Sequence, residues 1–95
     1  MASIVNGYTI EPGADLTGAN LTNSNFYNSD LSGANLSGAS LAGADFGFAN
    51  LSGADFTGAD LTNAVLVAAD LTSAKIDADD WDKLTADQQA AANLS

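Results

Sequence analysis

The chain of 95 residues contains neither cysteine nor histidine. These absences exclude a disulfide framework, a thiolate metal site, and the commonest general base and metal ligand in proteins. Basic residues are scarce too, because two of them stand against 12 acidic residues and the formal net charge is −10. Since so few positive charges can replace the counterions of a nucleic acid, we expect no direct binding of DNA or RNA.

The chain also lacks long hydrophobic runs. No apolar stretch approaches the roughly 20 residues that cross a bilayer, so no membrane partner is expected. The N-terminal sequence MASIVNGYTI has neither the basic region nor the apolar region of a secretory signal, which indicates a cytoplasmic protein. An export signal removed before this start would leave no trace in the sequence.

Residues that carry chemistry are equally scarce. The glycines form no phosphate-binding loop, and no histidine is present to activate the many hydroxyl groups. The segment DADDWD at 77–82 resembles a calcium loop, but it lacks the glycine of loop position six, and Gln88 stands where a bidentate glutamate belongs. We therefore expect no enzyme activity, no cofactor and no metal site.

A five-residue repeat is the main positive signal. Every fifth residue from 16 to 76 is large and apolar. These residues are Leu16, Leu21, Phe26, Leu31, Leu36, Leu41, Phe46, Leu51, Phe56, Leu61, Leu66, Leu71 and Ile76. The residue two places earlier is always alanine or serine, and the residue one place earlier is aspartate or asparagine at ten of the thirteen steps. A period of five fits neither an α-helix nor a β-strand and is typical of a solenoid, whose interior takes one large and one small side chain per unit.

The units of the form A-(D/N)-(L/F)-(S/T)-(G/N) over residues 14–78 resemble those of the pentapeptide-repeat family. The resemblance implies an all-β solenoid, namely a right-handed quadrilateral parallel β-helix of about three coils, with four units or 20 residues in each coil. It also implies a non-enzymatic module of unassigned biochemical role, as for many family members. The family is abundant in cyanobacteria, so a cyanobacterial origin is expected.

The N-terminal end of such a solenoid needs a cover, because an open β-helix exposes unpaired strand edges and core. Residues 1–13 are expected to form this cap, with Pro12 blunting a strand edge. The apolar residues that the cap contributes are Ile4, Val5, Tyr8 and Ile10.

Residues 79–95 are expected to form the C-terminal cap, which includes a short capping α-helix over about 86–93. A capping box, TADQ at 85–88, marks the start of this helix. Trp81 is expected to lie as a lid over the last coil. The residues assigned to the cap are Trp81, Leu84, Thr85 and Gln88.

A coil of 20 residues places residues 20 apart in one column, and the units then define four sides. The first side comprises 14–18, 34–38, 54–58 and 74–78, the second 19–23, 39–43 and 59–63, the third 24–28, 44–48 and 64–68, and the fourth 29–33, 49–53 and 69–73. Phe26 and Phe46 share an inner column, so their rings are expected to stack. Outer aspartates alternate with asparagines or serines between layers, which separates like charges and favours amide hydrogen bonds from layer to layer.

The third side carries the one local anomaly. Tyr27, Phe48, Val65 and Val67 converge on its outer surface, and Gly47 leaves a gap into which a neighbouring ring can lean. The other sides present mainly serine, threonine, glycine, asparagine and aspartate. An exposed apolar patch of this kind indicates a contact surface. Its occupant is open between the termini of this chain, a second copy in a homodimer, and a different protein.

Two function hypotheses follow. The preferred one is a structural or protein-interaction module with the third side as its contact or dimer face. The alternative, which the family resemblance and the net charge of −10 suggest, is a DNA-mimicking acidic inhibitor or protector of DNA gyrase. The expected length disfavours the alternative, because about three coils at roughly 4.8 Å per layer match fewer than about five base pairs at roughly 3.4 Å each.

Overall fold

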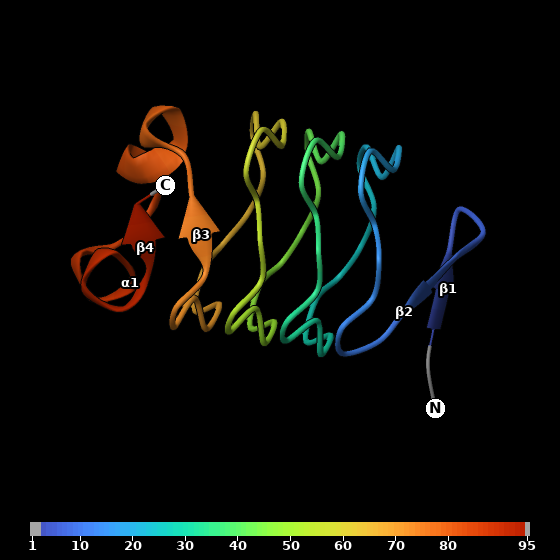
Figure 1. The fold of residues 1–95 in the computed structure, drawn as a ribbon, viewed down its shortest axis with the longest axis horizontal. Coiled ribbons are helices and arrows are strands. Elements are labelled where there is room, and N and C mark those ends of the chain that lie inside the picture. Colours follow the sequence, from blue (N-terminus) through green and yellow to red (C-terminus); the bar gives the residue numbers. More distant parts are fainter. Residues whose placement is uncertain (1–2, 95) are drawn as a thin grey trace.

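The computed structural model describes residues 3–94, and for residues 3 and 4 only the backbone. The side chain of Ile4, expected in the N-terminal cap, therefore lies outside the described part. The elements are β1 (Ser3–Val5), β2 (Tyr8–Ile10), β3 (Lys75–Ile76), the 3-10 helix η1 (Ala78–Lys83), α1 (Ala86–Ala91) and β4 (Asn93–Leu94). Between β2 and β3 the chain winds in coils that are stacked along the long axis, with a hairpin at one end and helices at the other (Figure 1).

Each five-residue unit bends the chain by one β-turn. In the unit centred on Leu16, the N–H of Ala19 donates to the carbonyl of Leu16 over 3.1 Å, and Gly18 has a φ of 67°. A positive φ at the third residue of a turn is the mark of type II, which favours glycine or asparagine there. The small residues at the unit ends are therefore the corner residues of the solenoid.

Parallel backbone pairing holds successive coils together. Isolated bridges join residues 20 apart, as between Asp15 and Asn35 and between Asn35 and Asp55. Beside the first of these bridges, the N–H of Leu16 donates to the carbonyl of Asn35 (2.8 Å), and the N–H of Asn35 donates to the carbonyl of Ala14 (2.9 Å). Pairing at this constant spacing makes the repeat region a parallel β-helix solenoid.

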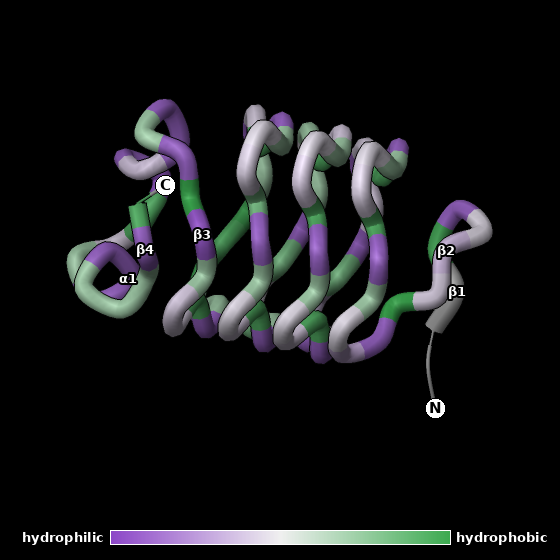
Figure 2. Tube along the Cα trace, in the orientation of Figure 1, coloured by the Kyte–Doolittle hydropathy of each residue, from purple (hydrophilic) through white to green (hydrophobic). Residues whose placement is uncertain are grey.

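The interior of the solenoid is a narrow apolar column. All the large residues at the unit centres are buried, with at most 6% of any one exposed. The rings of Phe26 and Phe46 stack with centroids 5.0 Å apart and planes 14° apart, and Phe56 meets Phe46 edge-on at 5.8 Å. Figure 2 shows hydrophobic and hydrophilic residues alternating along each coil. The core therefore has an aromatic stack in its middle.

The outer aspartates and asparagines bond within their own units, so the expectation of amide hydrogen bonds from layer to layer is wrong for the described residues. The Oδ1 atom of Asp15 accepts from the N–H (3.2 Å) and the hydroxyl (2.7 Å) of Thr17. The Oδ1 atom of Asn35 accepts in the same way from Ser37. The local bond prevails because the short side chain reaches the N–H two residues on, and that N–H has no partner in the neighbouring coil.

The N-terminal hairpin covers part of the first coil. Its strands pair antiparallel around Asn6 and Gly7, whose φ values of 49° and 82° are those of a type I′ turn. Ile10 is 5% exposed and belongs to the core, and the side-chain amide of Asn6 donates to the carbonyl of Asn20 over 3.0 Å. Tyr8 stays 37% exposed, so Ile10 seals the core at this end and Tyr8 does not.

Pro12 opens the repeat instead of blunting a strand edge. It is the second residue of a turn in which the N–H of Ala14 donates to the carbonyl of Glu11 over 3.1 Å, and Gly13 has a φ of 74°. Proline at the second position and glycine at the third are favoured in a type II turn. The coil geometry therefore begins at Glu11, before the expected start at residue 14.

The C-terminal helix is shorter than expected. α1 ends at Ala91 instead of at about residue 93, and Asn93 and Leu94 form β4, which pairs in parallel with β3. The N–H of Asn93 donates to the carbonyl of Ala74 over 2.7 Å, so the ladder continues past β3. The open edge of the last coil supplies backbone partners for an extended strand, and this pairing overrides the local preference for helix.

Of the residues assigned to the C-terminal cap, Trp81 and Leu84 pack on the core and Gln88 bonds to the last coil, whereas Thr85 is exposed. Trp81 belongs to η1 and packs, partly buried, on the core, and Leu84 is 7% exposed. The N–H of Gln88 donates to Oγ1 of Thr85 (3.2 Å), and the N–H of Thr85 donates to Oε1 of Gln88 (2.9 Å). These reciprocal bonds are the capping box that begins α1.

Candidate interaction face

Four large apolar side chains are exposed together on the third side, and we call them the third-side face. The exposed fractions are 55% for Tyr27, 56% for Phe48, 42% for Val65 and 59% for Val67. At these exposures the termini within residues 3–94 leave the face open to solvent. Among the described residues, the only other exposed large apolar side chains are Tyr8 and Leu94, which lie in the two end segments.

The third side differs from the others because it lacks their hydroxyl groups. On the other sides a serine or threonine hydroxyl donates to the aspartate or asparagine two residues earlier, as from Thr62 to Asp60 over 2.6 Å. At the corresponding positions the third side has Tyr27, Gly47 and Val67. The third side is therefore the one side on which this polar pair is missing from every layer, whereas the second side lacks it only in the layer of Ala42.

Gly47 allows the face to form across two layers. A Cβ atom added to Gly47 would lie 3.0 Å from Cδ2 of Tyr27, which is too close for an ordinary contact. The ring of Tyr27 therefore leans over the backbone of Gly47, which is buried. It meets the ring of Phe48 at a centroid distance of 5.6 Å and an interplanar angle of 61°. Tyr27 from one coil and Phe48 from the next thus form one aromatic pair.

Phe48 is held in an unfavourable backbone conformation. It is the corner residue of its unit and has a φ of 56°, in the left-handed region where a bulky side chain is an outlier. All the glycines and asparagines at unit corners have a positive φ, as do Ala68 and Ser73, but glycine and asparagine adopt this conformation at little cost. For other residues the cost is about 1–2 kcal/mol. The fold alone thus gives no reason for an exposed phenylalanine at this corner.

Phe48→Asn is expected to leave the free energy of unfolding unchanged or to raise it by up to about 1 kcal/mol. Asparagine tolerates the left-handed conformation, and this relief offsets the loss of the aromatic contact with Tyr27. Urea unfolding followed by circular dichroism measures the difference. Ala68→Asn is the matched control, because Ala68 has the same φ of 56° and no aromatic ring. A loss of more than about 2 kcal/mol in Phe48→Asn alone would make Phe48 a structural residue.

Hydrogen bonds from threonine shift the titration of several outer carboxyl groups. The pKa is lowered below its ordinary value at Asp15, Asp55, Asp60 and Asp70. At each of them the largest cause is the hydroxyl of the threonine two residues on, followed by the backbone N–H of the same threonine. These bonds favour the ionised carboxylate, which accepts but does not donate.

The protein is expected to lose stability only in acid. Because these pKa values are lowered in the folded chain, their contribution to stability is complete above the unfolded values and is lost as the pH falls through the folded ones. We expect the thermal midpoint to be constant from about pH 8 to about pH 5 and to fall below about pH 4, since the chain has no histidine or cysteine. Thermal unfolding followed by circular dichroism at a series of pH values tests this.

The control for the pH series is the triple variant Thr17→Val, Thr62→Val, Thr72→Val. Valine keeps the shape of threonine and removes the hydroxyl donor, so the midpoint of this variant should fall less steeply in acid. A midpoint that rises between about pH 5 and pH 3 would contradict the prediction. It would mean that relief of repulsion among the excess carboxylates exceeds the lost hydrogen bonds.

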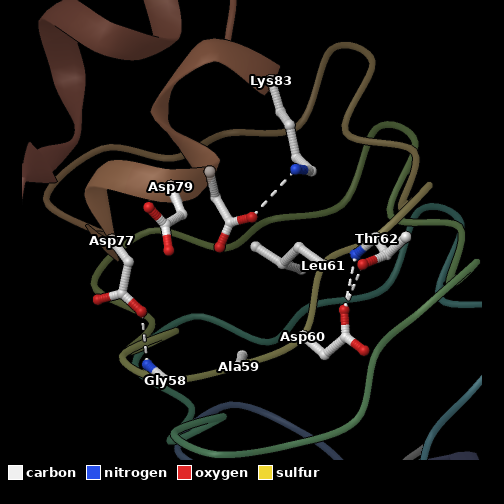
Figure 3. Close-up of a pocket in the computed structure, with 9 residues that line it drawn as sticks. Gly58, Ala59, Asp60, Leu61, Thr62, Asp77, Asp79 and Lys83 are labelled. Atoms are coloured by element: carbon white, nitrogen blue, oxygen red, sulfur yellow. Dashed lines mark hydrogen bonds and ion pairs between the residues drawn. The ribbon is translucent and has the colours of Figure 1, made fainter.

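A hollow of about 390 Å³ lies between the second side and η1, and three of the four acids that line it make structural contacts (Figure 3). Asp60 accepts from Thr62, and Oδ2 of Asp77 accepts from the N–H of Gly58 over 2.6 Å. Asp80 is 8% exposed and forms an ion pair with Nζ of Lys83 at 3.1 Å. The residues described hold no group of three or more histidine, cysteine or acidic side chains suited to a metal ion.

The ion pair between Asp80 and Lys83 was missed in the sequence, although its spacing of three residues was the available signal. No helix in the part of the chain that the structure covers is long and apolar enough to cross a membrane. The stacked parallel layers define a repeat solenoid with an apolar patch on its third side.

Comparison with known proteins identifies the family of this solenoid. The family profile of pentapeptide repeats matches residues 12–38 and 39–77 in eight copies. The chain therefore belongs to the pentapeptide repeat family, as the five-residue units predicted, and its fold is the right-handed β-helix solenoid of that family. No curated protein matches the chain.

Solved structures of three family members are similar to the chain. A pentapeptide repeat protein from the thylakoid lumen of Arabidopsis thaliana is 35% identical over 70% of this chain and 50% of its own, with a TM-score of 0.47. One from the cyanobacterium Cyanothece 51142 is 40% identical over 67% of this chain and 47% of its own, with a TM-score of 0.40. HetL of the cyanobacterium Nostoc is 35% identical over 68% and 39%, with a TM-score of 0.26.

The chain spans about half the length of the first two of these proteins. HetL is involved in the regulation of heterocyst differentiation. Members of this family are generally structural or interaction modules and not enzymes. Membership of the family therefore assigns no role to the third-side face, and its role is inferred from its residues.

Proposed function

We propose that this protein is a non-enzymatic structural or protein-interaction module whose contact surface is the third-side face. Its scaffold in this proposal is a quadrilateral β-helix of about three coils, closed by a C-terminal cap. The observation that carries the proposal is the clustering of four exposed apolar side chains on one side of an otherwise polar solenoid. Exposed apolar patches with a polar surround are typical of contact surfaces.

The cost of Phe48 supports the same proposal. An exposed phenylalanine with a φ of 56° reduces the stability of the free protein. Residues held in such conformations cluster at ligand clamps and other functional sites. A contact that buries the ring provides the reason for a phenylalanine at this corner, because the burial of one phenylalanine side chain contributes about 1.5–3 kcal/mol.

The double variant Phe48→Asn, Val67→Thr tests the proposal. It replaces the centre of the face with residues that the repeat uses elsewhere at the same positions, so the fold is kept. Light scattering after size-exclusion chromatography measures self-association. A pull-down on the immobilised protein measures the binding of partner proteins. A loss of self-association or of partner binding that occurs only in this variant supports the third-side face as the contact surface. The control is the double variant Thr22→Ser, Thr62→Ser on the second side. Equal self-association and equal partner binding in the wild type, the face variant and the control would reject the proposal.

A second candidate function is mimicry of DNA toward DNA gyrase, which the net charge of −10 favours. The outer columns weaken this candidate, because asparagine separates the aspartates, as Asn35 does between Asp15 and Asp55. A supercoiling assay with purified gyrase tests it. Inhibition that disappears when Asp30 and Asp70 are changed to asparagine would place this candidate first.

A further inference from the structure

We propose that the third-side face binds a different protein, whose surface has an apolar centre surrounded by arginine or lysine, and not a second copy of this chain. The inference rests on the proposed function, since it assumes that the face makes a contact. It adds the chemistry of the partner. Three observations carry it, namely the size of the face, the charges beside it, and the positions of the two lysines.

The apolar face is too small to form a stable interface alone. Four partly exposed side chains provide a few hundred Å² at most, whereas a stable interface buries about 800 Å² on each partner. A partner that covers the face must therefore extend over the neighbouring outer positions. The charge of those positions then decides which partner fits.

Acidic residues border the face where it turns into the fourth side. Phe48 is the corner residue, and two residues later Asn50 forms bridges with Asp30 in one layer and with Asp70 in the other. Asp30 and Asp70 are exposed. Asp45 lies within the third side itself, where its Oδ1 accepts from the N–H of Gly47 over 2.8 Å. A contact that spreads beyond the four apolar side chains thus meets carboxylates.

Among residues 3–94, no lysine or arginine lies on the third or the fourth side to balance these carboxylates. The two basic residues of the chain are Lys75, in β3 on the first side, and Lys83, which pairs with Asp80 in η1. If the face packed on the same face of a second copy, carboxylates would meet carboxylates, and each chain would bring a net charge of −10. Like charges set against each other across an interface repel and suppress that pairing.

A basic rim on the partner resolves this conflict. Arginine or lysine beside an apolar centre matches the carboxylates of the fourth side and raises the rate of encounter. The aromatic pair of Tyr27 and Phe48 adds a second means of recognition, because an arginine guanidinium stacks favourably on an exposed ring. Both effects act at the corner between the third and fourth sides.

The test uses synthetic peptides as partner probes and isothermal titration at about 50 and about 300 mM salt. One peptide alternates leucine with arginine over 12 residues, a second replaces arginine with glutamate, and a third replaces leucine with serine. We expect the wild-type protein to bind the first peptide at least about tenfold more tightly than the others. Binding should weaken at the higher salt concentration.

Matched variants separate the local effect from the overall charge. Asp30→Asn, Asp70→Asn beside the face and Asp15→Asn, Asp55→Asn on the first side change the net charge equally. The first pair should weaken binding of the leucine–arginine peptide about tenfold, and the second pair should have little effect. Equal effects of the two pairs, or no binding of this peptide, would overturn the inference.

Self-association is measured on the same proteins by light scattering. A dimer that is lost in Phe48→Asn, Val67→Thr would also overturn the inference, because the face would then serve a second copy, but the proposed contact function would stand. Binding of the leucine–arginine peptide that this double variant leaves unchanged would overturn the inference and the contact function together.

Discussion

Phe46→Ala is expected to destabilise the protein by about 3–5 kcal/mol, which is a large part of the stability of a domain of this size. Phe46 is fully buried, stacks on Phe26 and meets the edge of Phe56. Its removal leaves a cavity in the middle of a column that is one side chain deep, and coils fixed by backbone bonds have little freedom to close it. Urea unfolding followed by circular dichroism measures the loss.

Two further variants make this prediction decisive. Phe48→Ala removes the same kind of side chain two residues away, where it is 56% exposed, and should cost less than about 1 kcal/mol. Phe46→Leu keeps a large apolar residue of the type found at most unit centres, and should cost less than about 1.5 kcal/mol. If Phe46→Ala does not fold, the leucine variant still provides a measurable loss. Similar losses for alanine at both positions would contradict the assigned core.

The inner part of this fold was predictable because the five-residue period is long and regular. Once a unit is assigned to one side of a coil, arithmetic alone assigns every later residue to a side and a layer. Phe26 and Phe46 were placed in one column in this way, and their rings stack. The same arithmetic separated Phe46, which is buried, from Phe48, which is exposed.

The five-residue period does not predict which of two competing hydrogen bonds a side chain forms, the one within its own unit or the one to the next layer. Asp15 and Asn35 are neighbours in a column, yet each bonds to its own unit, because the local N–H is closer than the next layer. The end of α1 was also missed. The alanine- and glutamine-rich segment from residue 86 predicts a helix to about 93, but the edge of the last coil pairs with Asn93 and Leu94 as a strand.

The third-side face was predictable from the sequence in its location but not in its detailed geometry. Its four residues follow from the period and the coil length, so the sequence brought them together. The ring of Tyr27 over Gly47 and the left-handed backbone of Phe48 depend on side-chain packing and turn geometry, which the period does not contain. The backbone strain at Phe48 is therefore visible only in the structure, whereas the location of the face follows from the sequence.

Gln88→Glu is expected to destabilise the protein by about 2–4 kcal/mol. The side chain of Gln88 is 8% exposed, and its amide donates to the carbonyls of Leu66 (2.7 Å) and Ala69 (3.2 Å) in the last coil. These bonds take the place of a further coil above the third and fourth sides. A carboxylate keeps the acceptor for the N–H of Thr85 but faces the two carbonyls without a donor. Urea unfolding measures the loss.

The dependence of this loss on pH distinguishes its cause. In the variant, burial and the two carbonyls favour the protonated carboxyl group, which regains one donor, so the difference from wild type should shrink as the pH falls from about 7 to about 4, through the raised pKa of the folded state to the ordinary pKa of glutamate. Gln89→Glu adds the same charge next to it. Gln89 is only partly buried and donates to the carbonyl of Trp81 (3.0 Å), so its replacement should cost less. Equal losses in the two variants would mean that the added charge, and not the lost bonds to the last coil, destabilises the cap.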